Sequence, residues 1–171
     1  MKNIFLIGFM GTGKSTVAKK IHVACGMEVI EMDGLIAERE GMSITKIFET
    51  HGEEYFRNLE TNLLIEVQKQ DDKVVSCGGG VVLRKQNVSE MKKNGVVVLL
   101  TAKPETILKR VKGNNERPIL KGNINVAFIT ELLEQRREKY EEAADLVIAT
   151  DGKATTTICK EIIERVNEME R

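Results

Sequence analysis

The segment Gly8 to Ser15 has the residue types and the spacing that bind a phosphate chain. It reads Gly-Phe-Met-Gly-Thr-Gly-Lys-Ser, which matches the pattern GxxxxGK[ST]. Glycines allow a tight turn whose backbone N–H groups point at phosphate oxygens, and a following helix adds the positive end of its dipole. Lys14 can reach the β- and γ-phosphates, and the Ser15 hydroxyl can bind Mg²⁺. The nucleotide contacts expected here are Gly11, Thr12, Gly13, Lys14, Ser15 and Thr16.

A phosphate-binding loop by itself does not distinguish kinases from GTPases or motor ATPases. A GTPase would normally carry Asn-Lys-x-Asp, and no asparagine in this chain is followed by lysine. A motor ATPase would normally end a buried strand on an acidic residue. Here the run Val74 to Cys77 leads into glycines, and the run Val96 to Leu100 leads into Thr101. A kinase that uses ATP is favoured.

Acidic residues that could serve a kinase stand at the end of the second expected strand. A phosphoryl acceptor needs an acid near its attacking hydroxyl, and Glu31 and Asp33 are the acids at this point of the chain. The carboxyl ends of neighbouring strands open onto one crevice in a doubly wound sheet, so both acids are expected beside the phosphate loop. Alternatively, Asp33 caps a helix that starts near Gly34.

Arg57 and a run of three glycines are candidates for binding the acceptor. Glu53, four residues before Arg57, and Glu60, three residues after it, fall on the same helical face. This spacing is equally typical of a solvated charge ladder. Gly78-Gly79-Gly80 follows a buried strand and removes every side chain where a ligand could approach the backbone. A simple turn would explain the same glycines.

The elements that must position these residues alternate along the chain, which predicts a parallel sheet covered by helices on both faces. The expected strands are 3–7, 28–32, 73–77, 95–100 and 145–149. The expected helices are 15–25, 43–50, 53–69, 104–112, 126–143 and 153–169. Gly113 to Asn125 is polar and bounded by glycines, which predicts a mobile loop.

Length and composition are those of a soluble globular domain. The chain has 171 residues, 42% of them hydrophobic and 30% charged, and its formal net charge is zero. A neutral chain has no general attraction to nucleic acid or to an acidic membrane, so no partner of either kind is expected. The apolar run at Ile4 to Ile7 is too short for a signal segment or a membrane span, which predicts a cytoplasmic protein.

In their order along the chain, these motifs resemble those of one family, the shikimate kinases. The matching segments are Gly8 to Thr16, Asp33, Phe56-Arg57 with Glu60, Gly78-Gly79-Gly80, Arg117-Pro118-Ile119-Leu120, and Arg136 four residues before Tyr140. The resemblance implies transfer of the γ-phosphoryl group of ATP to the 3-hydroxyl of shikimate, in aromatic amino acid biosynthesis. It implies one P-loop kinase domain over residues 1–171, with five parallel strands in the order 2-3-1-4-5 and a lid loop at about 113–125. A monomer that requires Mg²⁺ is also implied.

The resemblance assigns roles to single residues. Asp33 is the catalytic base, Lys14 acts on the phosphates, and Arg117 closes over them. The implied substrate contacts are Asp33, Arg57, Gly79 and Arg136. Arg110 and the stretch 150–153 fall where the family holds adenine.

Two positions depart from the family pattern. Glu31 stands where the family usually has aspartate, which affects the expected link to the hydration shell of Mg²⁺. Glu138 stands where the family often has proline, which makes Arg137 a rival for the role of Arg136. The spacing to Tyr140 favours Arg136.

Two other functions are consistent with the sequence. One is a related small-metabolite kinase that acts on gluconate or a nucleoside monophosphate. Another is a regulatory protein that binds a nucleotide but has lost transfer.

Overall fold

The computed structural model describes residues 2–112 and 125–170, and its centre is a sheet of five parallel strands in the order β2-β3-β1-β4-β5. The strands are β1 (Asn3–Ile7), β2 (Glu28–Glu31), β3 (Lys73–Ser76), β4 (Gly95–Thr101) and β5 (Leu146–Ala149). Each starts and ends within one residue of its predicted bounds. The predicted α/β class and strand order are confirmed.

The helices surround this sheet. They are α1 (Lys14–Cys25), α2 (Met32–Glu40), α3 (Ile44–His51), α4 (Glu53–Val67), α5 (Lys85–Lys93), α6 (Pro104–Val111), α7 (Val126–Ala143) and α8 (Thr155–Met169), together with the short 3₁₀ helix η1 (Val81–Leu83). Six of these match predicted helices. α5 and η1 were not predicted, and α2 was foreseen only in the alternative of a helix starting near Gly34. Polar residues dominate α5, and Gly34 lies inside α2, so neither has a clear apolar stripe.

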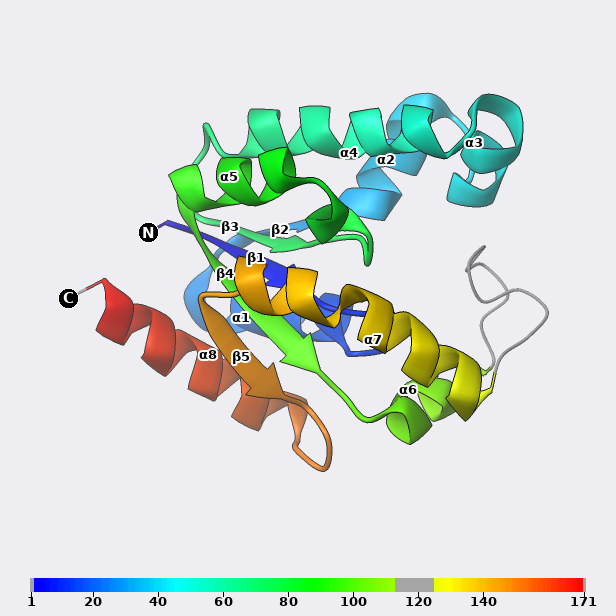
Figure 1. The fold of residues 1–171 in the computed structure, drawn as a ribbon. Helices are drawn as coiled ribbons and strands as arrows, with labels where there is room; N and C mark the ends of the chain where they lie inside the picture. Colours follow the sequence, from blue (N-terminus) through cyan, green and yellow to red (C-terminus); the bar gives the residue numbers. More distant parts are fainter. Residues whose placement is uncertain (1, 113–124, 171) are drawn as a thin grey trace.

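Two layers of helices cover the two faces of the sheet (Figure 1). One core cluster joins the sheet to α1 and α8, with Val17, Ile21, Ile158 and Ile162 buried in it. The other joins the opposite face to α2, α3, α4 and α5 and to the end of α7. Every residue of β1 is buried, because this central strand is covered on both faces.

Local sequence signals account for the starts of three helices. Gly13, directly before α1, has φ 94° and ψ 20°, a left-handed conformation that glycine adopts at no steric cost. The Ser43 side chain accepts a hydrogen bond of 3.1 Å from the Lys46 backbone N–H, which caps α3. Pro104 is the first residue of α6, where its fixed φ suits a helix and its missing N–H costs nothing.

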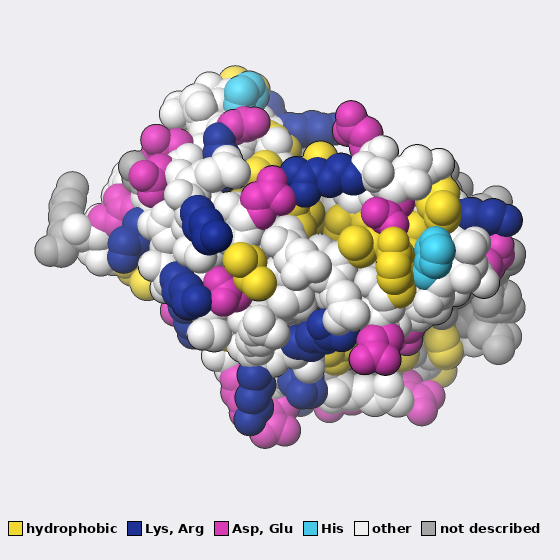
Figure 2. Space-filling view, turned by 90° about the horizontal axis from the view of Figure 1, so that it is seen from above, with side chains coloured by type: hydrophobic (Ala, Val, Ile, Leu, Met, Phe, Trp, Pro, Cys, Tyr) yellow, Lys and Arg dark blue, Asp and Glu magenta, His cyan; other side chains and the backbone are white. Residues whose placement is uncertain are grey.

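Charges of both signs cover the molecular face on the side of α4. In the view of Figure 2, lysine and arginine side chains are interspersed with aspartate and glutamate. This pattern fits a chain with 26 basic and 26 acidic residues. No helix within residues 2–112 and 125–170 is long and apolar enough to cross a membrane.

Candidate active site

A cavity of about 700 Å³ opens where β1, β2 and β3 end and the segments that follow them begin. Of the predicted site residues, its lining contains Gly11, Gly13, Lys14, Ser15, Thr16, Asp33, Arg57, Gly79 and Arg136. Parallel strands present their carboxyl ends at one edge, which brings residues distant in sequence into this one place. A second hollow, of about 600 Å³, lies near Lys92, Gly95 and Asp145, and none of the predicted site residues lines it.

The phosphate loop is tightly folded, and its lysine lies against it. The Lys14 ammonium donates to the carbonyl oxygens of Gly8, at 2.7 Å, and Phe9, at 3.0 Å. The Thr12 hydroxyl donates to the same Phe9 oxygen at 2.8 Å. These bonds hold one positive charge at the start of α1, where the helix dipole is also positive. The loop therefore has the geometry and the charge to receive an anion.

Ser15 and Glu31 lie together and fit the oxygen ligands that Mg²⁺ prefers. The Ser15 hydroxyl donates to Glu31 Oε2 at 2.9 Å and lies 3.4 Å from the Ser76 hydroxyl. Glu31 Oε1 is buried and has no hydrogen-bond partner among the described residues. A buried carboxylate oxygen with no partner is costly, and a metal ion or its bound water would satisfy it. The glutamate that departs from the family pattern therefore reaches the serine expected to hold the metal.

Asp33 does not lie on the second strand. β2 ends at Glu31, and Asp33 is in the first turn of α2, whose N-cap position is Glu31. The alternative in which Asp33 caps a helix starting near Gly34 is wrong for the same reason. The sequence indicated that both acids end one strand and reach the same site. Both side chains do line the cavity, although Asp33 reaches it from the first turn of a helix.

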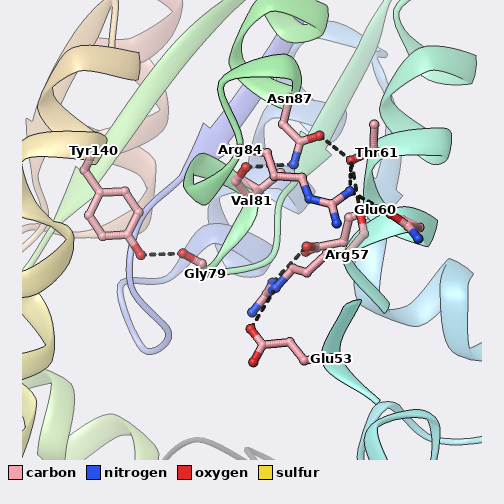
Figure 3. Close-up of polar contacts among 10 residues, drawn as sticks. Glu53, Arg57, Glu60, Thr61, Gly79, Val81, Arg84, Asn87 and Tyr140 are labelled. Atoms are coloured by element: carbon pink, nitrogen blue, oxygen red, sulfur yellow. Dashed lines mark hydrogen bonds and ion pairs between the residues drawn. The ribbon is translucent and has the colours of Figure 1, made fainter. Parts of the chain in front are cut away.

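Arg57 forms a buried ion pair rather than part of a solvated charge ladder. Its Nη1 atom lies 2.8 Å from Glu60 Oε1, and the Glu60 side chain is fully buried (Figure 3). Glu53, 3.3 Å from Arg57 Nε, is the exposed member of the three. Burial raises the pKa of Glu60 from 4.5 to about 7, although Arg57 acts in the opposite direction. Glu60 therefore keeps its proton to a higher pH than an exposed glutamate would.

The three glycines after β3 allow charged side chains to approach the backbone closely. A Cβ on Gly78 would lie 2.7 Å from Glu60 Oε2 and 3.1 Å from Asp33 Oδ1. A Cβ on Gly80 would collide with the guanidinium of Arg57. Side chains at these positions would displace the groups that line the cavity. The run is therefore more than a turn.

Arg136 and Arg137, adjacent on α7, face different surroundings. Arg136 is 9% exposed, lines the cavity, and has a buried Nη1 atom with no hydrogen-bond partner among the described residues. The Arg137 side chain is 63% exposed and pairs with Glu134 and Glu141. Of the two rivals, Arg136 is the one placed to meet a ligand.

Of the residues expected near adenine and the phosphates, Arg110 lies against the phosphate loop and Arg117 is not described. Arg110 donates to the Gly11 carbonyl at 2.9 Å and lies 3.4 Å from the Thr150 hydroxyl. These contacts link α6 and the segment after β5 to the phosphate loop. Arg117 and the expected lid at 113–125 lie outside the described residues, apart from Asn125.

Glu60 and Tyr140 were not predicted as site residues. In the family's motifs they stand only beside Arg57 and Arg136, with no role of their own. The Tyr140 hydroxyl donates to the Gly79 carbonyl at 2.6 Å (Figure 3). Its position four residues after Arg136 places it on the same helical face, and that spacing was the available signal.

Comparison with known proteins gives consistent results along the chain. The family model described as shikimate kinase matches residues 10–167. A shikimate kinase of Caldanaerobacter subterraneus subsp. tengcongensis is 43% identical over 163 residues, covering 95% of each chain. The structure of shikimate kinase from Acinetobacter baumannii in complex with shikimate superposes with a TM-score of 0.93 at 32% identity, covering 98% of this chain and 94% of that one. Shikimate kinase from Aquifex aeolicus superposes with a TM-score of 0.83 at 35% identity, covering 96% of both chains.

Proposed function

Because this chain belongs to the shikimate kinase family, we propose that the cavity at the carboxyl ends of β1, β2 and β3 is where ATP and shikimate react. The chain is an ATP-dependent kinase of aromatic amino acid biosynthesis, with shikimate and ATP as its substrates. The assignment of the site is based on one observation. A single cavity holds the phosphate loop with Lys14, the acid Asp33, and the arginines Arg57 and Arg136.

The acceptor is held by its carboxylate in this proposal. Arg57 and Arg136 approach the cavity from different helices, α4 and α7, and both are largely buried. Guanidinium groups bind a planar carboxylate through paired hydrogen bonds, and burial strengthens such bonds. The Gly79 backbone supplies the remaining contact. A ring fixed at these points has one hydroxyl, the 3-hydroxyl, directed at the γ-phosphate.

Transfer itself uses Asp33 and Lys14. Asp33 accepts the proton of the attacking hydroxyl as the new O–P bond forms, and its place in the same cavity lining as Lys14 supports this role. Lys14 stabilises the charge that develops on the transferred group, together with Arg117 on the segment expected to act as a lid. The bond between the γ-phosphorus and the bridging oxygen breaks, and ADP leaves.

Mg²⁺ is the cofactor of this proposal. The Ser15 hydroxyl would bind it directly, and Glu31 would hold one of its waters, which the extra methylene of glutamate allows. When bound, the ion offsets the negative charge of the nucleotide phosphates.

The proposal also includes a single functional domain, a monomer, a cytoplasmic location and no nucleic acid or membrane partner. The domain and the monomer rest on the family resemblance. The lack of a nucleic acid or membrane partner rests on the zero net charge, and the location, like the domain and the monomer, rests on the family.

The experiment is a coupled ADP-release assay with shikimate, gluconate, AMP and CMP as acceptors. Shikimate should be preferred over each of the others by at least about a hundredfold in kcat/KM, because only shikimate pairs a ring carboxylate with the hydroxyl to be phosphorylated. The Lys14→Ala protein serves as the blank for contaminating kinases. Preference for another acceptor would overturn the substrate, and ATP hydrolysis that no acceptor stimulates would overturn the proposed reaction.

A further inference from the structure

The hydroxyl of Tyr140 makes a long-range hydrogen bond that ties α7 to the glycine run after β3. It donates to the Gly79 carbonyl at 2.6 Å across 61 residues of sequence, and the tyrosine is 4% exposed (Figure 3). The cavity lining includes Gly79 and Arg136 but not Tyr140. Tyr140 therefore lies behind two residues of the proposed acceptor site without facing the acceptor.

Four consecutive carbonyl groups in this segment each have a hydrogen-bond donor. Gly78 accepts from the Val81 N–H at 3.1 Å, and Gly80 accepts from the Leu83 N–H at 3.1 Å. The Val81 carbonyl accepts from the Asn87 side chain at 2.9 Å. Of these four carbonyls, that of Gly79 is the one that accepts a hydrogen bond from a residue of α7, which is Tyr140. Because the peptide unit is planar, fixing that carbonyl also fixes the direction of the Gly80 N–H.

The same helical face that carries Tyr140 also carries Arg136. The two are four residues apart, and a Cβ on Gly79 would lie 3.4 Å from Arg136 Nη1 and 3.8 Å from the Tyr140 hydroxyl. Both side chains therefore lie beside one glycine. Burial raises the pKa of Tyr140, although nearby Arg136 acts in the opposite direction, so the phenol keeps its proton and can donate at neutral pH.

We propose that Tyr140 is a positioning residue of the acceptor site, whose hydroxyl sets the distance between the Gly79 backbone and the Arg136 guanidinium. This inference rests on the proposed function, in which those two groups bind the carboxylate-bearing acceptor. Tyr140 acts through them and does not touch the transferred phosphoryl group. Its loss should weaken binding of shikimate and leave ATP binding and the transfer step largely intact.

The test compares Tyr140→Phe with the matched control Tyr55→Phe. Each removes one hydroxyl, but Tyr55 is exposed and bonds to Glu40 at 2.5 Å, far from the glycine run in sequence. We expect Tyr140→Phe to raise KM for shikimate about tenfold, as for a buried carbonyl that loses its donor. We expect KM for ATP and kcat to change less than about twofold in both variants, as follows when only acceptor binding is affected. Equal KM for shikimate in Tyr140→Phe and Tyr55→Phe would overturn the proposal, even if Tyr140→Phe melts at a lower temperature.

A binding measurement covers the case in which Tyr140→Phe does not fold. The chain has two tyrosines and no tryptophan, so Tyr55→Phe leaves Tyr140 as the only strong intrinsic fluorophore. Its emission should change saturably with shikimate in the absence of ATP, and an unchanged emission while shikimate binds by calorimetry would overturn the proposal. If the wild-type protein does not phosphorylate shikimate, the proposed function fails. If the wild-type protein phosphorylates shikimate but the KM comparison and the fluorescence change are both negative, only the positioning role of Tyr140 fails.

Discussion

The ionisation of Glu60 predicts how the free energy of unfolding changes with pH, both in direction and in magnitude. Burial raises its pKa from 4.5 to about 7 in the folded protein. Between those values the folded protein keeps a proton on Glu60 that the unfolded chain has released, so the free energy of unfolding falls as pH rises. This contribution is fully present below pH 4.5 and is lost as pH rises through about 7. The shift corresponds to about 3 kcal/mol at 1.36 kcal/mol per pKa unit.

Glu60→Gln removes the ionisation while keeping the shape and an oxygen that can accept from Arg57. Relative to the wild type, the variant should therefore gain about 3 kcal/mol in free energy of unfolding between pH 4.5 and pH 8. The assay is urea unfolding followed by far-ultraviolet circular dichroism at several pH values, with the slope on urea checked for constancy.

Glu66→Gln is the matched control, because Glu66 pairs with Arg39 at 2.8 Å but its side chain is 47% exposed. The hydrogen bond to Arg39 lowers the pKa of Glu66, so its contribution is lost only as pH falls below its ordinary range. The difference between Glu66→Gln and the wild type should be flat above about pH 5. A flat difference for Glu60→Gln as well would mean that Glu60 is ionised throughout and that Arg57 outweighs burial, which would refute the reasoning.

Other predictions address the reaction directly. Lys14→Ala should abolish turnover with an unchanged circular dichroism spectrum, since its ammonium donates to the Gly8 and Phe9 carbonyls of the phosphate loop, where the nucleotide phosphates are expected; near-normal kcat would remove it from the mechanism. Asp33→Asn should lower kcat about 10²-fold or more, as for loss of a general base. Glu31→Gln should instead raise the Mg²⁺ concentration needed for half-maximal rate, and an exchange of these two phenotypes would reverse their roles. Arg136→Ala should weaken shikimate binding by roughly 2–5 kcal/mol, while exposed Arg137→Ala should change it by less than about 0.5 kcal/mol; equal effects would refute the choice of Arg136.

The phosphate loop and the sheet could be predicted because their signals are local. Glycine at position 13 is needed for a left-handed turn, and Lys14 and Ser15 must follow it directly. The buried run at 96–100 is continuous because its strand is covered on both faces. Such features depend on residues that are neighbours in the sequence. They can therefore be recognised without knowing which residues pack against them.

Short elements with weak patterns could not be predicted in the same way. α2 contains a glycine and begins inside the site, and α5 has few apolar residues, so tertiary contacts rather than periodicity determine both helices. The consequence for the site was specific. Asp33 reaches the cavity from a first helical turn, although the sequence indicated a strand end.

The sequence by itself determined the nucleotide loop, the order of the motifs and the family, because each depends on residue types at fixed spacings. Only the tertiary structure decided that Arg57 and Glu60 form a buried pair, since the same spacing on a solvated helix would look identical. It also decided that Tyr140 bonds to Gly79, 61 residues away in sequence. Both facts depend on which surfaces lose water when the helices pack on the sheet. Desolvation, which raises the pKa of Glu60 and strengthens the buried hydrogen bonds, is a property of the folded arrangement and not of any local pattern.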